Sequence, residues 1–237
     1  MANTDGGFSV NADTLRAVRA LRDLDVPLRA KIAESCVGLR VGTNHVVAES
    51  ETINDVYFVL SGVVRIRTNT ASGRALTYAL VRTGGMFGEI SAIDGGPLAA
   101  VAVAEESTRL ACITSVAFRG LARENAAISL AVSTWLAGVA RGYGQRVYEF
   151  HAFDVRTRIC AEVVRLAERQ TREPLEGGYL LRDAPTDSDL ASRIGTTREN
   201  VNRIVNALKT DGVMERVNGG LKLHNVVAMR EQIMAAQ

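Results

Sequence analysis

The chain has 237 residues, of which 47% are apolar, and its 28 basic and 26 acidic residues leave a formal net charge of +2. High apolar content with low net charge excludes disorder for most of the chain, and the length predicts one large or two modest domains. No apolar stretch reaches the roughly 20 uncharged residues of a membrane helix, and the first residues lack the pattern of a secretory signal. We therefore expect a cytoplasmic protein that does not bind membranes. The net charge is too small to indicate a partner.

The three cysteines are widely spaced and odd in number. They form neither a CxxC pair nor a metal-ligand cluster, which favours reduced thiols that act as small buried side chains. They are Cys36, Cys112 and Cys160.

Residues 12–40 are predicted to form short helices, because apolar residues recur at helical spacing and Pro27 can stand in the first turn of a helix. From Val41 the pattern changes to short β-rich runs about ten residues apart. This spacing predicts an antiparallel sandwich or barrel. The runs are 46–48, 56–60, 63–67, 76–81, 101–104 and 109–113.

From about Phe118 to about Arg169 the pattern is helical, with one apolar face. A helix whose apolar stripe extends beyond a small sandwich favours a dimerisation interface, and packing against its own sandwich is the alternative. Residues 151–154 are a predicted hinge, and 171–186 are expected to be a loop. The apolar face comprises Ile128, Val132, Trp135, Val139 and Tyr143, and it is interrupted by Gly138, Gly142 and Gly144.

Residues 186–208 predict two short helices joined at a glycine, the pattern of a helix-turn-helix. Thr186 is expected to cap the first helix, and Gly195 to take the positive φ of a tight turn. Thr196 is expected to cap the second helix, with Glu199 completing a capping box. The predicted inward residues are Leu190, Ala191, Ile194, Val201, Ile204, Val205 and Leu208.

The outward face of the second helix indicates contact with DNA. Glu199, Asn202 and Arg203 share one side, and Arg198 lies in the first turn. Recognition helices direct such residues at base edges: Arg pairs with guanine, Glu accepts from cytosine, and Asn pairs with adenine. After this helix, Asn218-Gly219 predicts a hairpin of two short strands, the wing of a winged helix.

This order of elements resembles the bacterial CRP/FNR family of transcription factors over roughly residues 20–230. The resemblance rests on the segments Val56–Arg65, Phe87-Gly88-Glu89-Ile90, Asp154–Ile159 and Thr197–Ile204. It implies an α+β fold with a jelly-roll domain, like those that bind cyclic nucleotides, over 1–118. A dimerisation helix with a hinge would then span 119–153, and a winged helix-turn-helix 154–237.

The resemblance further implies a transcription regulator that binds double-stranded DNA as a homodimer, on a palindromic site with TGTGA-like half-sites. RNA polymerase is an expected partner. Asn202 replaces a residue that is usually small in the family, which allows an additional or altered base contact. Arg198, Glu199 and Arg203 match the family's base-reading positions, and Thr186, Ser188 and Thr197 its phosphate contacts.

The effector site departs from the family pattern. Gly88 and Glu89 are present, but Leu98 and Ala99 stand where cyclic-nucleotide binders carry arginine and a hydroxyl residue, and Tyr143 replaces a polar residue that reaches the base. Leucine cannot pair with a phosphate as arginine does, so we expect a degenerate pocket and regulation independent of cyclic AMP. The alternative is gating by a cyclic nucleotide or another small ligand. The charge could then come from the Gly95–Gly96 amides, Arg65 or Arg82.

No cofactor or metal is expected. Cys36 is alone where the iron–sulfur branch carries a cysteine cluster, and only His45, His151 and His224 could serve as haem ligands. An enzyme is not expected, because no nucleophile–base set, metal-ligand spacing or phosphate loop is visible. A sensor that acts through protein contacts would have a degenerate helix-turn-helix, whereas this one is intact. The sequence gives neither the effector nor the target genes, nor whether transcription is activated or repressed.

Overall fold

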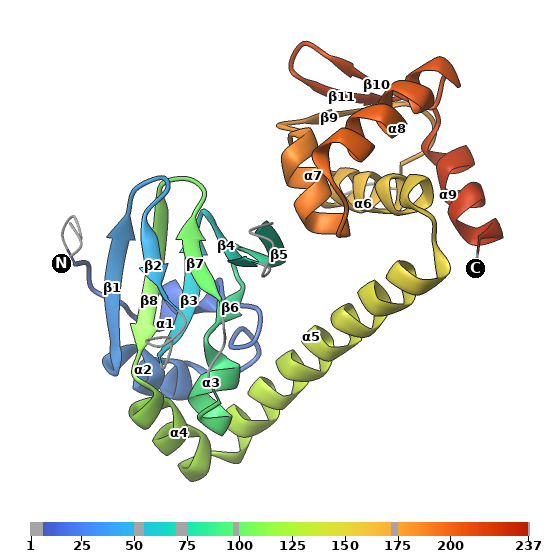
Figure 1. Ribbon diagram of the computed structural model, residues 1–237. Coiled ribbons are helices and arrows are strands. Elements are labelled where there is room, and N and C mark those ends of the chain that lie inside the picture. The colour runs from blue at the N-terminus through green and yellow to red at the C-terminus, as the bar shows by residue number, and fades with distance from the viewer. Residues whose placement is uncertain (1–6, 50–54, 70–74, 97–99, 172–174, 237) are drawn as a thin grey trace. The chain divides into compact units, whose positions relative to one another are not determined.

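The computed structural model describes residues 7–49, 55–69, 75–96, 100–171 and 175–236 (Figure 1). The chain divides into two compact units, Met1–Ala140 and Arg141–Gln237. The long helix α5 (Ala126–Ala152) contributes to both units. The domain boundaries expected at 118 and 153 remain predictions.

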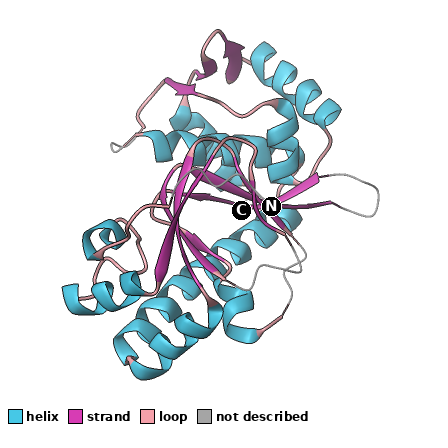
Figure 2. Ribbon diagram, turned by 90° about the vertical axis from the view of Figure 1, so that its left-hand side faces the viewer, coloured by secondary structure: helices cyan, strands magenta, loops and turns pink. Residues whose placement is uncertain are grey.

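Within the described residues, the first unit contains two four-stranded antiparallel sheets, ordered β1-β8-β3-β6 and β2-β7-β4-β5. Figure 2 shows strands in magenta and helices in cyan. Side chains of both sheets, including Val59, Val64 and Leu110, share one core, so the sheets pack face to face as the sandwich prediction required. The strands are β1 (Cys36–Val41), β2 (Val46–Ala48), β3 (Val56–Ser61), β4 (Val63–Asn69), β5 (Ala75–Arg82), β6 (Met86–Phe87), β7 (Val101–Ala104) and β8 (Thr108–Ile113).

Helices cover the outer face of the sheet that contains β3. Phe58 and Ile113 of that face pack with Leu15, Phe118 and Ile128 in a second core. Strand β3 is therefore buried on both faces over Val56–Val59, which explains its unbroken apolar sequence. The helices of this unit are α1 (Ala12–Arg16), α2 (Val26–Glu34), α3 (Glu89–Asp94), α4 (Ser115–Glu124) and the first part of α5.

One local prediction for this unit was wrong. Residues 36–41 form strand β1 instead of continuing a helix, because they pair with β8 from Cys36↔Ile113 to Val41↔Thr108. Residues 89–94 form α3, which begins after Gly88 at φ +86°. The expected helical region is confirmed, but it begins at Ser115 and is broken at Asn125.

The second unit has a core built from four helices and a small sheet. Ile159, Leu190 and Leu208 are fully buried in its centre. Helix α5 ends at Ala152 and α6 begins at Val155, so the helical pattern is interrupted at residues 153–154, and the hinge expected at 151–154 remains a prediction. The elements that follow α5 are α6 (Val155–Gln170), β9 (Tyr179–Arg182), α7 (Asp187–Ile194), α8 (Arg198–Thr210), β10 (Met214–Val217), β11 (Gly220–Leu223) and α9 (Val226–Ala235).

Strand β9 corrects the prediction that 171–186 is a loop. It pairs with β11, where Leu181 opposes Leu221 and both side chains are buried. A four-residue strand is too short to show a clear alternation, so the pairing with β11 determines it.

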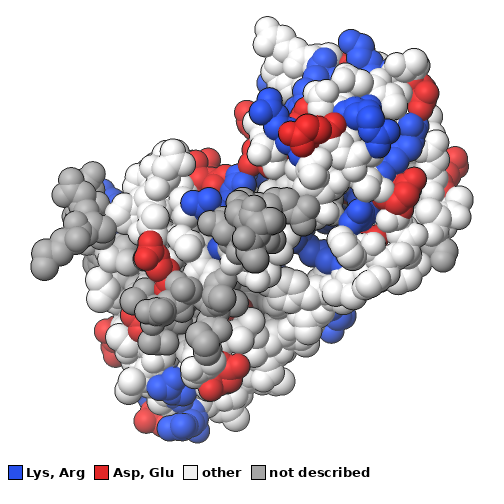
Figure 3. Space-filling view, in the orientation of Figure 1, with Lys and Arg blue, Asp and Glu red and all other residues white. Residues whose placement is uncertain are grey.

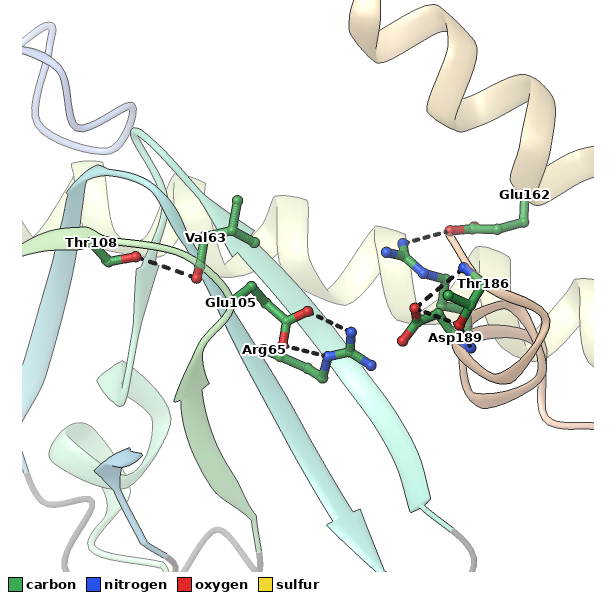
Figure 4. A network of polar contacts seen from close by, with 8 residues as sticks. Val63, Arg65, Glu105, Thr108, Glu162, Thr186 and Asp189 are labelled. Carbon is green, nitrogen blue, oxygen red and sulfur yellow. Dashed lines mark hydrogen bonds and ion pairs between the residues drawn. The ribbon is translucent and has the colours of Figure 1, made fainter. Parts of the chain in front are cut away.

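A buried carboxylate joins three helices of the second unit. The Glu162 side chain, labelled in Figure 4, is 4% exposed. It forms ion pairs with Arg165 of its own helix and with Arg193 of α7. Arg165 also reaches Glu149 near the end of α5, at 2.6 Å. Charges removed from water need such partners, so these residues fix the three helices to one another.

We predict that Glu162→Ala destabilises the second unit by about 3 kcal/mol, because it leaves two arginines without their buried partner. Urea unfolding followed by circular dichroism measures this loss. The single tryptophan, Trp135, lies in the first unit, so its fluorescence transition should not move. The control is Glu168→Ala in the same helix, which removes an exposed ion pair and should cost less than about 1 kcal/mol. Equal losses for both variants would contradict the prediction.

Candidate nucleic-acid interface and effector pocket

The helix-turn-helix begins with a complete capping box. The Thr186 hydroxyl accepts a hydrogen bond from the Asp189 N–H, and the Asp189 carboxylate accepts from the Thr186 N–H (Figure 4). Helix α7 ends at Gly195, whose φ of +70° confirms the predicted turn. A Cβ at this position would lie 3.3 Å from the Phe150 ring, so both the backbone angle and the packing favour glycine.

The second helix is capped one residue later than predicted. Thr197 has an extended backbone and accepts a hydrogen bond from the Asn200 N–H, so α8 starts at Arg198. Thr196 is buried, and its hydroxyl accepts from the Asn200 side chain instead. The predicted capping box is therefore wrong: the third helical position holds Asn200, which leaves Glu199 exposed on the outer face.

The side chains that the sequence predicted on the outward face of α8 are the ones that the structure exposes. Arg198, Glu199, Asn202 and Arg203 are all exposed. The opposite face is buried in the core of the unit. The predicted inward residues Leu190, Ala191, Ile194, Val201, Ile204, Val205 and Leu208 are each 8% exposed or less.

The three predicted phosphate contacts lie at helix N-termini. Thr186 precedes α7, Ser188 lies in its first turn, and Thr197 precedes α8; all three are exposed. Helix N-termini present unpaired N–H groups and a positive dipole end, which suits them to phosphate.

Beyond α8, β10 and β11 form the predicted hairpin, with Gly219 at φ +89° in its turn. Basic side chains, with acidic ones among them, gather over this unit on the face seen in Figure 3.

Sequence reasoning missed one group beside this face. The Asp187 carboxylate accepts hydrogen bonds from Asn202 and from Arg216 of β10. Burial opposes its ionisation, but these two donors outweigh burial and hold the pKa of Asp187 below its usual value. An aspartate in a first helical turn looks like a helix-dipole partner in the sequence, so nothing local distinguished it.

In the first unit, the carboxylate of the Phe87–Ile90 motif is buried against the chain's own long helix. Glu89 is 4% exposed, and the Trp135 indole N–H donates to it at 3.2 Å. Burial raises the pKa of the Glu89 carboxyl, while a backbone N–H and Trp135 act in the opposite direction. Gly88 adjoins it at the start of α3, whereas Tyr143 is 42% exposed on the part of α5 that belongs to the second unit. Leu98 and Ala99 lie outside the described residues.

Of the four groups that could have replaced the missing arginine, three have other partners and the fourth, Arg82, is exposed. The Gly95 N–H donates to the Ser91 carbonyl, and the Gly96 N–H donates to the Asp94 carboxylate at 2.8 Å. Arg65 forms a two-pronged ion pair with Glu105 (Figure 4). Arg82, at the end of β5, is exposed to solvent.

The cysteines lie in environments that suppress thiolate formation. Burial raises the pKa of Cys36 to about 12 and those of Cys112 and Cys160 to about 11. Among the described residues, no group of three His, Cys, Asp or Glu side chains is placed to hold a metal ion. In the same part of the chain, every helix is too short or too polar to span a membrane.

We predict that Glu89→Gln stabilises the first unit at neutral pH. Because the folded pKa is raised, stability from this group is greatest below the ordinary value of 4.5 and is lost as pH rises through the folded pKa. The variant's advantage over wild type should therefore be larger at about pH 8 than at about pH 5, as measured by urea unfolding with Trp135 fluorescence. The exposed Glu106→Gln is the control, with no pH-dependent difference expected. An advantage for Glu89→Gln that is equal at both pH values would refute the interpretation.

Comparison with protein families assigns a profile to each half of the chain. The cyclic nucleotide-binding domain matches residues 42–125, and the Crp-like helix-turn-helix domain matches residues 157–232.

Named relatives share both halves. The chain is 29% identical to the cyclic AMP receptor protein of Thermus thermophilus over 74% of this chain and 78% of that one. It is 28% identical to the CRP-like cAMP-activated global transcriptional regulator of Mycobacterium tuberculosis, over 67% and 70%. The structure of the c-di-GMP-responsive regulator CLP of Xanthomonas campestris has the same fold, with a TM-score of 0.73 and 19% identity. The match covers 85% of this chain and 100% of that one. The two profiles in this order, together with the relatives, show that the chain is a transcription regulator of the CRP/FNR family with a DNA-binding helix-turn-helix.

Proposed function

We propose that this protein regulates transcription as a homodimer on a two-fold related DNA site with TGTGA-like half-sites. The observation that carries the proposal is the outer face of α8, where Arg198, Glu199 and Arg203 are exposed over a buried opposite face. Such a regulator acts in the cytoplasm and contacts RNA polymerase once bound to its site.

Each residue of this face has a role that its chemistry supports. Arg198 and Arg203 can donate paired hydrogen bonds to guanine, and Glu199 can accept from a cytosine amino group. The hydroxyls of Thr186, Ser188 and Thr197 lie at helix N-termini, where phosphates bind. Asn202, also predicted to read a base, forms hydrogen bonds with Asp187 and Asn206.

The homodimer is supported by the long helix. Of the predicted apolar face, Ile128, Val132 and Trp135 pack in the core of their own unit, as the alternative had it. Apolar surface remains elsewhere on α5: Leu130 is 69% exposed and Val147 58% exposed, and a Cβ at Gly138 or Gly142 would have no neighbour within 4 Å in the described chain. A groove of about 700 Å³ runs between the segment 19–24 and this helix. Apolar residues and glycines that face open space allow a second helix to approach closely. Paired in this way, two recognition helices would reach half-sites about 34 Å apart.

Independence from cyclic AMP is supported by the charges around the motif. A cyclic phosphate must leave water on binding and needs a cation there. Leu98 offers none, Arg65 is paired with Glu105, and the buried Glu89 would add a repulsive charge if ionised. The alternative, gating by a cyclic nucleotide or another ligand, is favoured by the names of the Thermus and mycobacterial relatives.

We predict that Arg203→Ala abolishes specific binding, because each half-site loses a base contact that contributes about 1–3 kcal/mol. Fluorescence anisotropy on TGTGA-containing and scrambled duplexes measures the loss. Lys209→Ala, in the last turn of the same helix, is the matched control and should retain specificity. Sedimentation at micromolar concentration should give a dimer for the wild type and for both variants. An equal loss on both duplexes would mark Arg203 as a phosphate contact, and a monomer would refute the dimer.

We predict that DNA affinity does not change when cyclic AMP or cyclic GMP is added, because Leu98 stands where an arginine would pair with the phosphate. Isothermal calorimetry with each nucleotide should give no micromolar binding, and the nucleotide-free protein should bind its site. Micromolar calorimetric binding together with a rise of about tenfold in DNA affinity would establish the alternative of an effector-gated regulator.

A further inference from the structure

One carboxylate connects both helices of the helix-turn-helix to the wing. The Asp187 side chain in the first turn of α7 is 15% exposed. One of its oxygens accepts from Asn202 Nδ2 of α8 at 3.1 Å. The other accepts from Nε and Nη2 of Arg216 in β10, at 3.0 and 2.6 Å. Arg216 Nη2 also donates to the Pro185 carbonyl. Asp187 thus joins two residues that lie further along the chain, Asn202 by 15 positions and Arg216 by 29.

The amide of Asn202 is held at both of its ends. Nδ2 donates to Asp187, and Oδ1 accepts from Asn206 Nδ2 at 3.1 Å. Because an ionised carboxylate only accepts hydrogen bonds, the nitrogen must be the atom that faces Asp187, and the orientation of the amide is fixed. Pairing with adenine uses the same two atoms of the amide. Asn202 would have to turn away from Asp187 and Asn206 to read a base.

Turning away has an electrostatic cost. Asp187 lies beside a surface that must approach phosphates, and it is kept ionised by its two donors. Removal of the Asn202 amide leaves a partly buried carboxylate with one fewer donor, and hydrogen bonds to charged groups are stronger than neutral ones. The bidentate contact with Arg216 also depends on the position of Asp187, so the recognition helix and the wing strand share this anchor.

We propose that Asn202 is a positioning residue, which together with Asp187 and Arg216 locks the wing strand β10 to the recognition helix α8 and selects no base. The inference rests on the proposed DNA-binding function. It leaves Arg198, Glu199 and Arg203 as the base-reading set. It also gives Asp187 a role that needs no contact with DNA.

The first test is the base preference of the full-length dimer. Anisotropy titrations would use the half-site sequence and every single base-pair variant of it, with wild type, Asn202→Ala and Arg203→Ala. We expect Asn202→Ala to weaken binding by a similar factor on all duplexes, about three- to tenfold, without changing the order of preference. Arg203→Ala should flatten the preference at one position. A selective loss of preference at one base pair in Asn202→Ala would overturn the proposal.

The second test measures the lock itself by hydrogen exchange of the free protein, which does not depend on how DNA is read. Asn202→Ala and Asp187→Asn should both speed exchange of the β10–β11 amides while leaving those of α6 unchanged. Asn206→Ala is the matched control, because it spares the Asn202–Asp187 hydrogen bond and should leave the wing protected. Unchanged wing exchange in Asn202→Ala, or faster exchange throughout the unit, would overturn the proposal. If Arg203→Ala alters no preference, the proposed base reading fails, and this exchange experiment still decides whether the lock exists.

Discussion

The position of the recognition helix depends on the turn at Gly195. Its left-handed backbone ends α7 and redirects the chain into α8, and the Phe150 ring occupies the space that a side chain would need. Arg158 completes the arrangement: its guanidinium lies 4.8 Å from the centre of the Phe150 ring and donates to the Ile194 carbonyl. The last turns of α5 therefore support the turn directly. If α5 forms the dimer interface, the same helix that pairs two chains also fixes the turn that orients the DNA-reading face.

Two buried glutamates show how partners determine the role of a carboxylate. Glu162 meets two arginines, and the cost of burying its charge is offset by ion pairs that tie α5, α6 and α7 together. Among the described residues, Glu89 meets an indole N–H and a backbone N–H but no cation, so its burial is less well offset and its pKa rises. The first carboxylate belongs to a rigid scaffold. The second, Glu89, belongs to the Phe87–Ile90 motif of the expected effector site. Its hydrogen-bond partner there is Trp135 of the same chain.

The sequence predicted the elements whose signals are local. The cap at Thr186, the turn at Gly195 and the Asn218-Gly219 hairpin each depend on the chemistry of one or two neighbouring residues, and the structure has all three. Strands β1 and β9 were missed because their existence depends on pairing with β8 and β11, far away in the chain. The contact between Asp187 and Asn202 was missed for the same reason. Periodicity places Asn202 on the outer face, but it cannot show that a carboxylate from another helix lies beside it.

The charge balance of this face also bears on how DNA is distinguished. The whole chain carries only +2, so sequence-independent attraction to phosphates must come from the local arrangement of cations. Around α8, three arginines (Arg198, Arg203 and Arg216) are accompanied by two carboxylates (Asp187 and Glu199), and Arg216 is already paired. Phosphate contacts position a protein on DNA, whereas base contacts specify the sequence. On the proposed function, the hydrogen bonds of Arg198, Glu199 and Arg203 to base edges would supply a large share of the affinity. Fixing Asn202 and the wing to α8 reduces the conformational freedom lost when those few contacts form.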